Sequence, residues 1–356
     1  MAIIQVKNLT LPELETWVQQ VGEKPYRARQ LVRWIYGRGV ENFAEMTDLG
    51  RELRLRLAAQ AQIAQLEPAA IQSATDGTQK FLFRLQDGEQ IESVLIPEED
   101  RLTLCLSSQV GCRLGCAFCL TGKQGWRRNL EPGEIVDQVC AVRRWLPPGE
   151  RLTNLVLMGM GEPLDNYEAV VQALQILMME EGLHFSNRRI TLSTAGLVPE
   201  IGRLGQEGVG VNLAISLNAA DNETRSRLMP INRRYPLEHL LQACAEFPLP
   251  PRRRITFEYV MIREINDRPE DARRLARILQ GQRAKINLIP FNEHPGATFQ
   301  RPTEDRILAF QAILQQAHYT ALIRESRGRE ILAACGQLYG QGEEARRVGH
   351  SLQERV

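Results

Sequence analysis

The chain has 356 residues, a length that predicts about two domains or one large core with attachments. Lys and Arg number 44 and Asp and Glu 43, and the net charge of +1 argues against a uniformly cationic nucleic-acid clamp and against an acidic tail. Only five of the 44 basic residues are lysines, so the chain strongly prefers Arg to Lys. The Arg side chain suits contacts with phosphates and bases, but the base composition of the genome explains this preference equally well. The chain shows no signal peptide and no apolar run of about 18 residues, so we expect a cytoplasmic protein.

The first 60 residues predict a helical accessory domain. Pro12, two residues after Thr10, marks the first turn of a helix. Two more helices are expected over 26–36 and 49–59, from the spacing of their apolar residues.

Residues 61–98 change in character. Turn sequences around Asp76-Gly77 and Asp87-Gly88 flank apolar runs over 80–85 and 91–97. This pattern predicts a short antiparallel β extension.

Strands and helices alternate over 99–326. The expected strands are 102–107, 154–160, 189–194, 211–217, 255–261 and 285–290, and the expected helices are 134–146, 167–181, 199–207, 237–247, 269–280 and 304–317. The alternation predicts an α/β fold, a partial (β/α)6 TIM-like barrel whose chemistry lies at the carboxyl ends of the strands. Residues 327–356 are expected to form a loop and tail.

The strongest chemical signal is the C-x3-C-x2-C run of Cys112, Cys116 and Cys119. In a cytosolic protein, seven cysteines are not expected to form a disulfide framework. A zinc site would need a fourth ligand, and no further Cys or His lies nearby. Three thiolates on a [4Fe–4S] cluster leave one iron open to an amino and a carboxylate group. We favour the cluster, with zinc or a structural role as the alternatives.

This spacing, with Phe118 before the third Cys, resembles the signature of the radical S-adenosylmethionine (SAM) superfamily. The resemblance implies that the three thiolates bind a [4Fe–4S] cluster and that the open iron holds SAM. Glycines of the 159–163 turn let the main chain approach a ligand closely. The residues that match the family's cofactor contacts are Gly161, Glu162, Ser193, Ser216, Leu217, Asn218 and Asn292. One departure is Asn218, where the family usually has His.

Four further features narrow the resemblance: Glu92, Cys105 inside the first barrel strand, Cys335 in a late ACGQL sequence, and NLIPFNEHPG over 287–296. Together they resemble the RlmN family, adenine-C2 methyltransferases of ribosomal and transfer RNA, over nearly the whole chain. The resemblance implies that Cys335 carries the methyl group as S-methylcysteine and that Cys105 forms a transient disulfide with it. It also implies that Glu92 accepts the C2 proton, although Cys105 is the alternative acceptor.

The family's substrates are an unpaired adenosine of 23S rRNA and the adenosine 3′ of the anticodon in tRNA. An electron donor of the flavodoxin or ferredoxin type is implied, and we expect a monomer. The alternatives are a Cfr-type enzyme, which methylates C8, and a non-catalytic RNA-binding or iron–sulfur scaffold. Cys140 and Cys244 are predicted to be core residues, and the five His show no ligand spacing.

Basic residues that could contact RNA phosphates occur in local clusters. The Trp126 loop is the first candidate for base stacking. The arginines that could accompany it, each also explicable as a solvated face, are Arg27, Arg29, Arg33, Arg127, Arg128, Arg143, Arg144, Arg233, Arg234, Arg252, Arg253, Arg254, Arg346 and Arg347.

Overall fold

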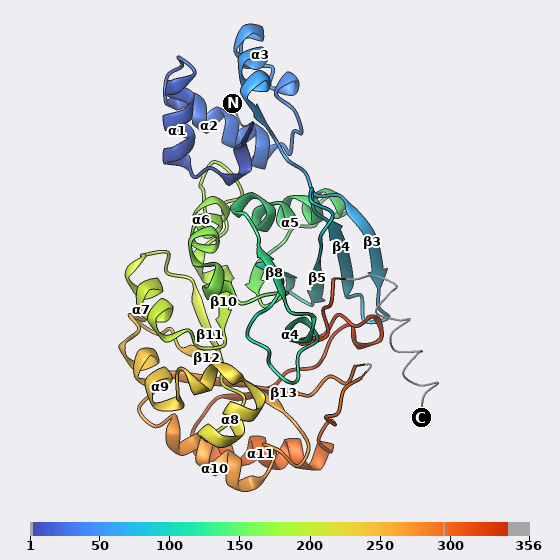
Figure 1. The fold of residues 1–356 in the computed structure, drawn as a ribbon, viewed down its shortest axis with the longest axis vertical. Helices are drawn as coiled ribbons and strands as arrows, with labels where there is room; N and C mark the ends of the chain where they lie inside the picture. Colours follow the sequence, from blue (N-terminus) through green and yellow to red (C-terminus); the bar gives the residue numbers. More distant parts are fainter. Residues whose placement is uncertain (1–2, 295, 341–356) are drawn as a thin grey trace.

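The computed structural model describes residues 3–294 and 296–340. Helices α1 (Leu11–Gln20), α2 (Tyr26–Val32) and α3 (Arg51–Gln60) form one end of the molecule (Figure 1). The first begins with a capping box, in which the Glu13 carboxylate accepts a hydrogen bond of 2.8 Å from the Thr10 backbone N–H. The second helix continues into a π-helical turn, Arg33–Gly37, so the predicted helix over 26–36 changes its winding near its end.

The two ends of this helical segment pair with each other. Strand β1 (Ile4–Gln5) lies parallel to β2 (Ala61–Gln62). The segment is tied to the rest of the chain by the buried Lys7, whose ammonium group forms an ion pair with Asp137.

Ten strands form one continuous sheet, in the order β14-β13-β12-β11-β10-β9-β6-β5-β4-β3. The antiparallel extension consists of β3 (Pro68–Ser73), β4 (Gln79–Arg84) and β5 (Gln90–Glu98). The parallel part consists of β6 (Arg101–Cys105), β9 (Asn154–Leu157), β10 (Ile190–Thr194), β11 (Asn212–Ser216), β12 (Ile255–Met261), β13 (Ala284–Pro290) and β14 (Ala321–Ile323). The predicted partial barrel is thereby confirmed, with β14 as an additional strand at its edge.

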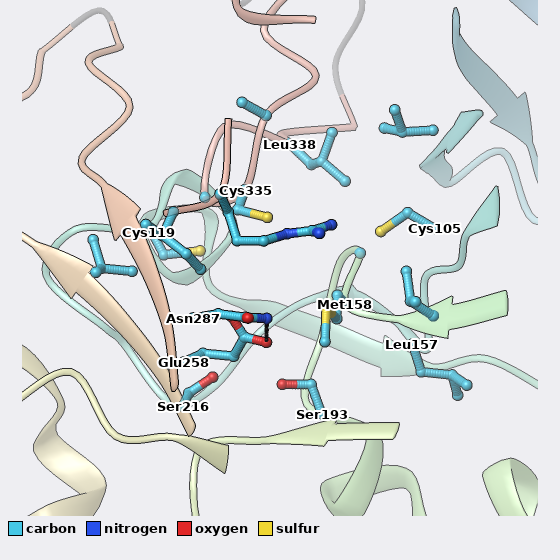
Figure 2. A pocket seen from close by; sticks show the side chains of 18 of the residues that line it. Cys105, Cys119, Leu157, Met158, Ser193, Ser216, Glu258, Asn287, Cys335 and Leu338 are labelled. Carbon is cyan, nitrogen blue, oxygen red and sulfur yellow. Dashed lines mark hydrogen bonds between the residues drawn. The ribbon is translucent and has the colours of Figure 1, made fainter. Parts of the chain in front are cut away.

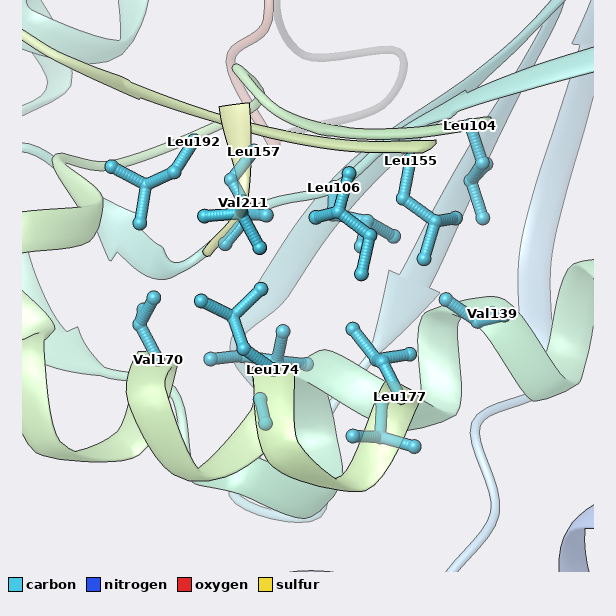
Figure 3. Close-up of a cluster of buried hydrophobic side chains, with 14 of the residues drawn as sticks. Leu104, Leu106, Val139, Leu155, Leu157, Val170, Leu174, Leu177, Leu192 and Val211 are labelled. Atoms are coloured by element: carbon cyan, nitrogen blue, oxygen red, sulfur yellow. The ribbon is translucent and has the colours of Figure 1, made fainter. Parts of the chain in front are cut away.

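Helices cover the outer face of the parallel strands (Figure 1). They are α5 (Pro132–Trp145), α6 (Tyr167–Leu177), α7 (Val198–Gln206), α8 (Asn222–Leu228), α9 (Leu237–Glu246), α10 (Pro269–Ile278) and α11 (Glu304–Gln316). Figure 3 shows how Leu174 and Leu177 of α6 and Val139 of α5 pack beneath Leu104 and Leu155 of the sheet. This apolar layer fixes the strands, so the positions of their carboxyl ends are set by the core.

A short hairpin was not predicted. Strand β7 (Gln109–Gly111) pairs with β8 (Trp126–Asn129), and α4 (Leu120–Gln124) lies between them. Trp126 therefore belongs to a strand and not to a free loop. The two strands can approach this closely because residue 111 is glycine: a Cβ at Gly111 would lie 1.7 Å from the carbonyl oxygen of Gly125. No helix within the described residues is long and apolar enough to cross a membrane.

Candidate active site

A cavity of about 390 Å³ opens at the carboxyl ends of the barrel strands. That volume lies in the range of ordinary small-molecule sites, about 300–1,000 Å³. Five of the seven cysteines line it: Cys105, Cys112, Cys116, Cys119 and Cys335. The other two, Cys140 and Cys244, are buried on outer helices, as predicted for core residues.

The loop with the three closely spaced cysteines is held from two sides. The Ala117 N–H donates to the Leu228 carbonyl at 2.9 Å, and the Leu120 N–H donates to the Gly336 carbonyl at 2.8 Å. Burial raises the pKa of Cys112 to about 12 and also raises the pKa of Cys116 well above its usual value, so neither is a thiolate without a nearby positive charge. Iron supplies such a charge when it binds thiolates.

The spacing of these thiols does not match a single-ion site. Within 3–294 and 296–340, no three Cys, His, Asp or Glu side chains are placed to hold one metal ion. A zinc ion needs all its thiolates at about 2.3 Å, whereas a [4Fe–4S] cluster bonds each thiolate to a different iron. The donor set therefore suits the cluster better than zinc.

The turn after β9 packs against the strand that leads to the cysteines. A Cβ at Gly159 would lie 2.7 Å from the Leu106 carbonyl oxygen, and one at Gly161 would lie 2.6 Å from Gln109. The missing side chains let this turn pack closely against the neighbouring strand, and both glycines also line the cavity into which their main chain was expected to approach a ligand. Gly161 lines the cavity, and a ligand would contact its main-chain atoms.

Glu162 ties this turn to the next strand. One carboxylate oxygen accepts a hydrogen bond from the Ala195 N–H at 2.8 Å and the other accepts from the Leu164 N–H at 3.2 Å. Burial raises the pKa of Glu162 to about 7 despite these bonds. The carboxyl lines the cavity and joins the carboxyl ends of β9 and β10.

The other predicted cofactor residues divide into two groups. Ser193, Ser216, Asn218 and Asn292 line the cavity. Leu217 does not: its side chain is fully buried, and its backbone N–H donates to the Glu258 carbonyl at 2.9 Å.

Asn218 and Asn292 use their amide groups differently. Asn218 has a positive φ of 58°, which Asn tolerates, and its side-chain oxygen accepts from the Val260 N–H at 2.8 Å. Asn292 donates to the Cys335 carbonyl at 3.1 Å. Its side-chain oxygen is buried and has no hydrogen-bond partner among the described residues. A ligand with N–H or O–H donors, such as SAM, would satisfy that oxygen.

Cys335 and Cys105 reach the cavity from elements that are far apart in the sequence. Figure 2 shows both sulfur atoms pointing into it, one from the loop after β14 and one from β6. Cys335 is exposed to the cavity, whereas Cys105 is 8% exposed. The surrounding protein raises the pKa of Cys335 to about 11, and burial also raises the pKa of Cys105.

Glu92 does not line the cavity. Its side chain is buried, forms an ion pair of 3.1 Å with Lys80, and accepts a hydrogen bond of 2.9 Å from the Tyr339 N–H. Lys80 in turn donates to the Leu332 carbonyl at 3.3 Å. Glu92 and Lys80 therefore hold both ends of the loop that carries Cys335.

Most of the predicted RNA-contacting arginines of the barrel have partners within the protein. Arg127 pairs with Glu89, and Arg128 with Asp87 and Glu134. The guanidinium of Arg113 covers the Trp126 ring at 3.8 Å, and Trp126 is 40% exposed. Arg346 and Arg347 lie outside the described residues, as does His350.

Three polar side chains were missed by sequence reasoning. Arg225 of α8 is fully buried and donates to the carbonyls of Ala195 at 2.7 Å and Leu217 at 3.0 Å, which fixes the ends of β10 and β11. Glu258 and Asn287 line the cavity from the middle of β12 and β13. The alternation of polar and apolar residues in ITFEYVM and AKINLIP was the available signal.

Comparison with known proteins agrees with this site. The model of the ribosomal RNA large subunit methyltransferase N-terminal domain matches residues 4–63, and that of the radical SAM superfamily matches residues 106–276. Two curated relatives named dual-specificity RNA methyltransferase RlmN are each 56% identical to this chain. The match with the relative from Syntrophobacter fumaroxidans covers 94% of this chain and 98% of the relative. The match with the relative from Geobacter sulfurreducens covers 95% of this chain and 93% of the relative. The crystal structure of a radical SAM methyltransferase from Sphaerobacter thermophilus is 47% identical, covers 95% of this chain and 100% of that chain, and gives a TM-score of 0.90. The chain therefore belongs to the RlmN family of dual-specificity RNA methyltransferases, within the radical SAM superfamily, as its cysteine motifs predicted.

Proposed function

We propose that this protein methylates C2 of an unpaired adenosine in 23S rRNA and of the adenosine 3′ of the anticodon in tRNA, through S-methylcysteine on Cys335. The observation that carries the proposal is that Cys105 and Cys335 face the same cavity as the three closely spaced cysteines. A merely structural iron–sulfur scaffold has no need of two further thiols there. The relatives' names favour this activity over a Cfr-type C8 methylation.

Cys112, Cys116 and Cys119 are assigned as ligands of a [4Fe–4S] cluster. SAM is assigned to Gly161, Glu162, Ser193, Ser216, Asn218 and Asn292, with Leu217 limited to its main chain. When bound, these groups supply the one-electron chemistry that an sp² carbon without an acidic proton requires. The unpartnered oxygen of Asn292 and the volume of the cavity support the fit.

Each remaining residue has a distinct task. Cys335, exposed to the cavity on a fixed loop, carries the methyl group. Cys105 lies across the cavity as the thiol that resolves the adduct, and Glu92 is assigned as the proton acceptor. Because Glu92 is bonded to Lys80 and Tyr339, it also positions the loop on which Cys335 lies.

We further propose that the protein acts in the cytoplasm as a monomer and receives electrons from a flavodoxin or ferredoxin. The target base must leave its stack to reach a cavity that opens at the ends of the barrel strands, so an unpaired loop nucleotide is the expected substrate. Residues 1–60 are proposed to help dock the RNA. Arg33 is an exposed residue there, and no ion pair to it is found among the described residues.

The test compares Cys335→Ala with Cys244→Ala, a buried cysteine on α9 that does not line the cavity. Both variants are reconstituted anaerobically, and iron, sulfide and methyl transfer from labelled SAM to an RNA stem-loop are measured. We expect both to bind a full cluster, and only Cys335→Ala to lose methyl transfer. Turnover by Cys335→Ala, or reconstitution with zinc alone, would contradict the proposal.

A further inference from the structure

Glu258 is a buried carboxyl whose hydrogen-bonding capacity is mostly unused. Its residue is 7% exposed and lines the cavity. Its hydrogen bond is to the Asn287 amide, whose nitrogen donates to the Glu258 carboxylate at 2.9 Å. Among the described residues it forms no ion pair and has no second hydrogen-bond donor. Its second carboxylate oxygen opens to the cavity, where a ligand that carries a hydrogen-bond donor would complete the site.

Two other buried carboxyls, one in the cavity wall and one behind it, contrast with Glu258. Glu162 is bonded to two backbone N–H groups, and Glu92 to Lys80 and to a backbone N–H. Lys285 and Arg324 also line the cavity and lower the pKa of Glu258 through their charge, yet neither lies close enough for an ion pair with it. Arg324 instead contacts Glu98 at 3.8 Å.

The strand register sets the orientation of Glu258. Ser216 on β11 pairs with Glu258 on β12, which pairs with Asn287 on β13, so the three side chains form one row on the inner face of the barrel. Figure 2 shows this row on the side of the cavity facing the Cys105 and Cys335 sulfur atoms. The side-chain nitrogen of Asn287 already donates to one carboxylate oxygen of Glu258. The row therefore offers a ligand two oxygen acceptors, the second carboxylate oxygen of Glu258 and the side-chain carbonyl of Asn287.

The chemistry of the target base decides which donor meets these acceptors. A base that reacts at C2 must place C2 at the sulfur of Cys335. Glu258 and Cys335 line the same cavity, the one from strand β12 and the other from the loop after β14 (Figure 2). Adenine carries one hydrogen-bond donor group, the 6-amino group, on the six-membered ring that contains C2. The ribose is attached to the other ring and points away.

Building on the proposed function, we propose that Glu258, oriented by Asn287, accepts a hydrogen bond from the 6-amino group of the flipped target adenine and thereby selects adenine over purines without that group. Glu258 is then a specificity-determining residue that contacts the substrate. Loss of a hydrogen bond to a charged acceptor corresponds to about a 10- to 100-fold loss in efficiency.

The test uses the cluster-loaded enzyme and RNA stem-loops with adenosine or purine riboside, which lacks the 6-amino group, at the target position. The ratio of kcat/KM for the two RNAs is measured in wild type, Glu258→Leu and Glu258→Gln, with Thr256→Ala on the same strand as control. The dissociation constant of SAM is measured for each by equilibrium dialysis.

We expect the ratio of kcat/KM for adenosine to that for purine riboside to fall by about 10- to 100-fold in Glu258→Leu. In Glu258→Gln, which keeps an acceptor oxygen, the ratio should stay within a few-fold of wild type. In Thr256→Ala it should be unchanged. SAM affinity should be unchanged throughout. An unchanged ratio in a folded Glu258→Leu would overturn the proposal, as would weaker SAM binding without a change in ratio, or a collapse of the ratio in Glu258→Gln. If wild type makes no C2-methyladenosine, the proposed function fails instead.

Discussion

The Glu92 carboxylate accepts a hydrogen bond from the backbone N–H of Tyr339 at 2.9 Å, across 247 positions of the chain. This bond fastens the loop of Cys335 to strand β5 of the antiparallel extension. Lys80 on the neighbouring strand β4 pairs with the same carboxylate at 3.1 Å. The extension therefore positions the thiol that is proposed to carry the methyl group.

Lys80→Met is expected to destabilise the fold strongly. It leaves the buried Glu92 charge without its cation, a change that costs about 3–5 kcal/mol in comparable sites. Urea unfolding measures the loss, with Lys24→Met at an exposed position as control, expected within about 0.5 kcal/mol of wild type. Adding Glu92→Gln to Lys80→Met removes the unpaired charge and should restore part of the stability. A double variant no more stable than Lys80→Met alone would argue against this ion pair.

Glu92→Gln separates the positioning role of Glu92 from its proposed role as a base. The Gln oxygen still accepts from Tyr339, so the loop of Cys335 should keep its place. Proton removal should fail, and a covalent RNA–protein adduct should accumulate on denaturing gels after anaerobic turnover. Adduct release at the wild-type rate would assign the proton to another group, with Cys105 the first candidate.

Gly161→Ala is expected to distort the turn after β9. Its φ of 99° disfavours any L side chain, and the new Cβ would lie 2.6 Å from Gln109. We expect a loss of at least about 2 kcal/mol in unfolding free energy, together with reduced cluster content. The matched control is Gly202→Ala in helix α7, where no atom lies within 4 Å of the added Cβ. That variant should be neutral or gain about 0.5–1 kcal/mol, and equal losses in both would contradict the packing argument.

Glu258 predicts a pH dependence of stability. Burial raises its pKa from 4.5 to about 7, so the folded state binds more protons than the unfolded state between these values. Wild-type stability should therefore fall as the pH rises through this range, by up to about 3 kcal/mol from this group. Glu258→Gln has no such charge, and Glu162, which also titrates near pH 7, is present in both proteins.

The measurement is chemical denaturation of Glu258→Gln and wild type at pH 5 and pH 8, without RNA. We expect the advantage of Glu258→Gln to be larger at pH 8 than at pH 5. Parallel stability curves would show that Glu258 is not desolvated in the fold.

The local features of the fold could be predicted from the sequence. The strand expected over 255–261 is found at those positions, and the one over 285–290 begins one residue earlier, because apolar alternation and flanking turns are local signals. The hairpin of β7 and β8 was missed because its strands are only three and four residues long and enclose the cysteine loop.

The sequence predicts those site residues that lie close together in the chain. It does not predict those that are brought together by the register of neighbouring strands. Three cysteines within eight residues predicted the cluster loop, whereas Glu258 gains its meaning from pairing with Ser216 and Asn287 on other strands. Asp87, a partner of Arg128, and Tyr339, a partner of Glu92, are also distant in the sequence, so a basic cluster and a candidate base both proved to be bound within the protein.

The central claim is tested most directly by mass spectrometry of RNA digests after anaerobic turnover with methyl-labelled SAM. The wild-type enzyme should place the label on C2 of one unpaired adenosine in 23S rRNA and of the adenosine 3′ of the anticodon in tRNA, and the label should be found on Cys335 before RNA is added. Label on C8 alone, or methylated RNA without prior labelling of Cys335, would contradict the account.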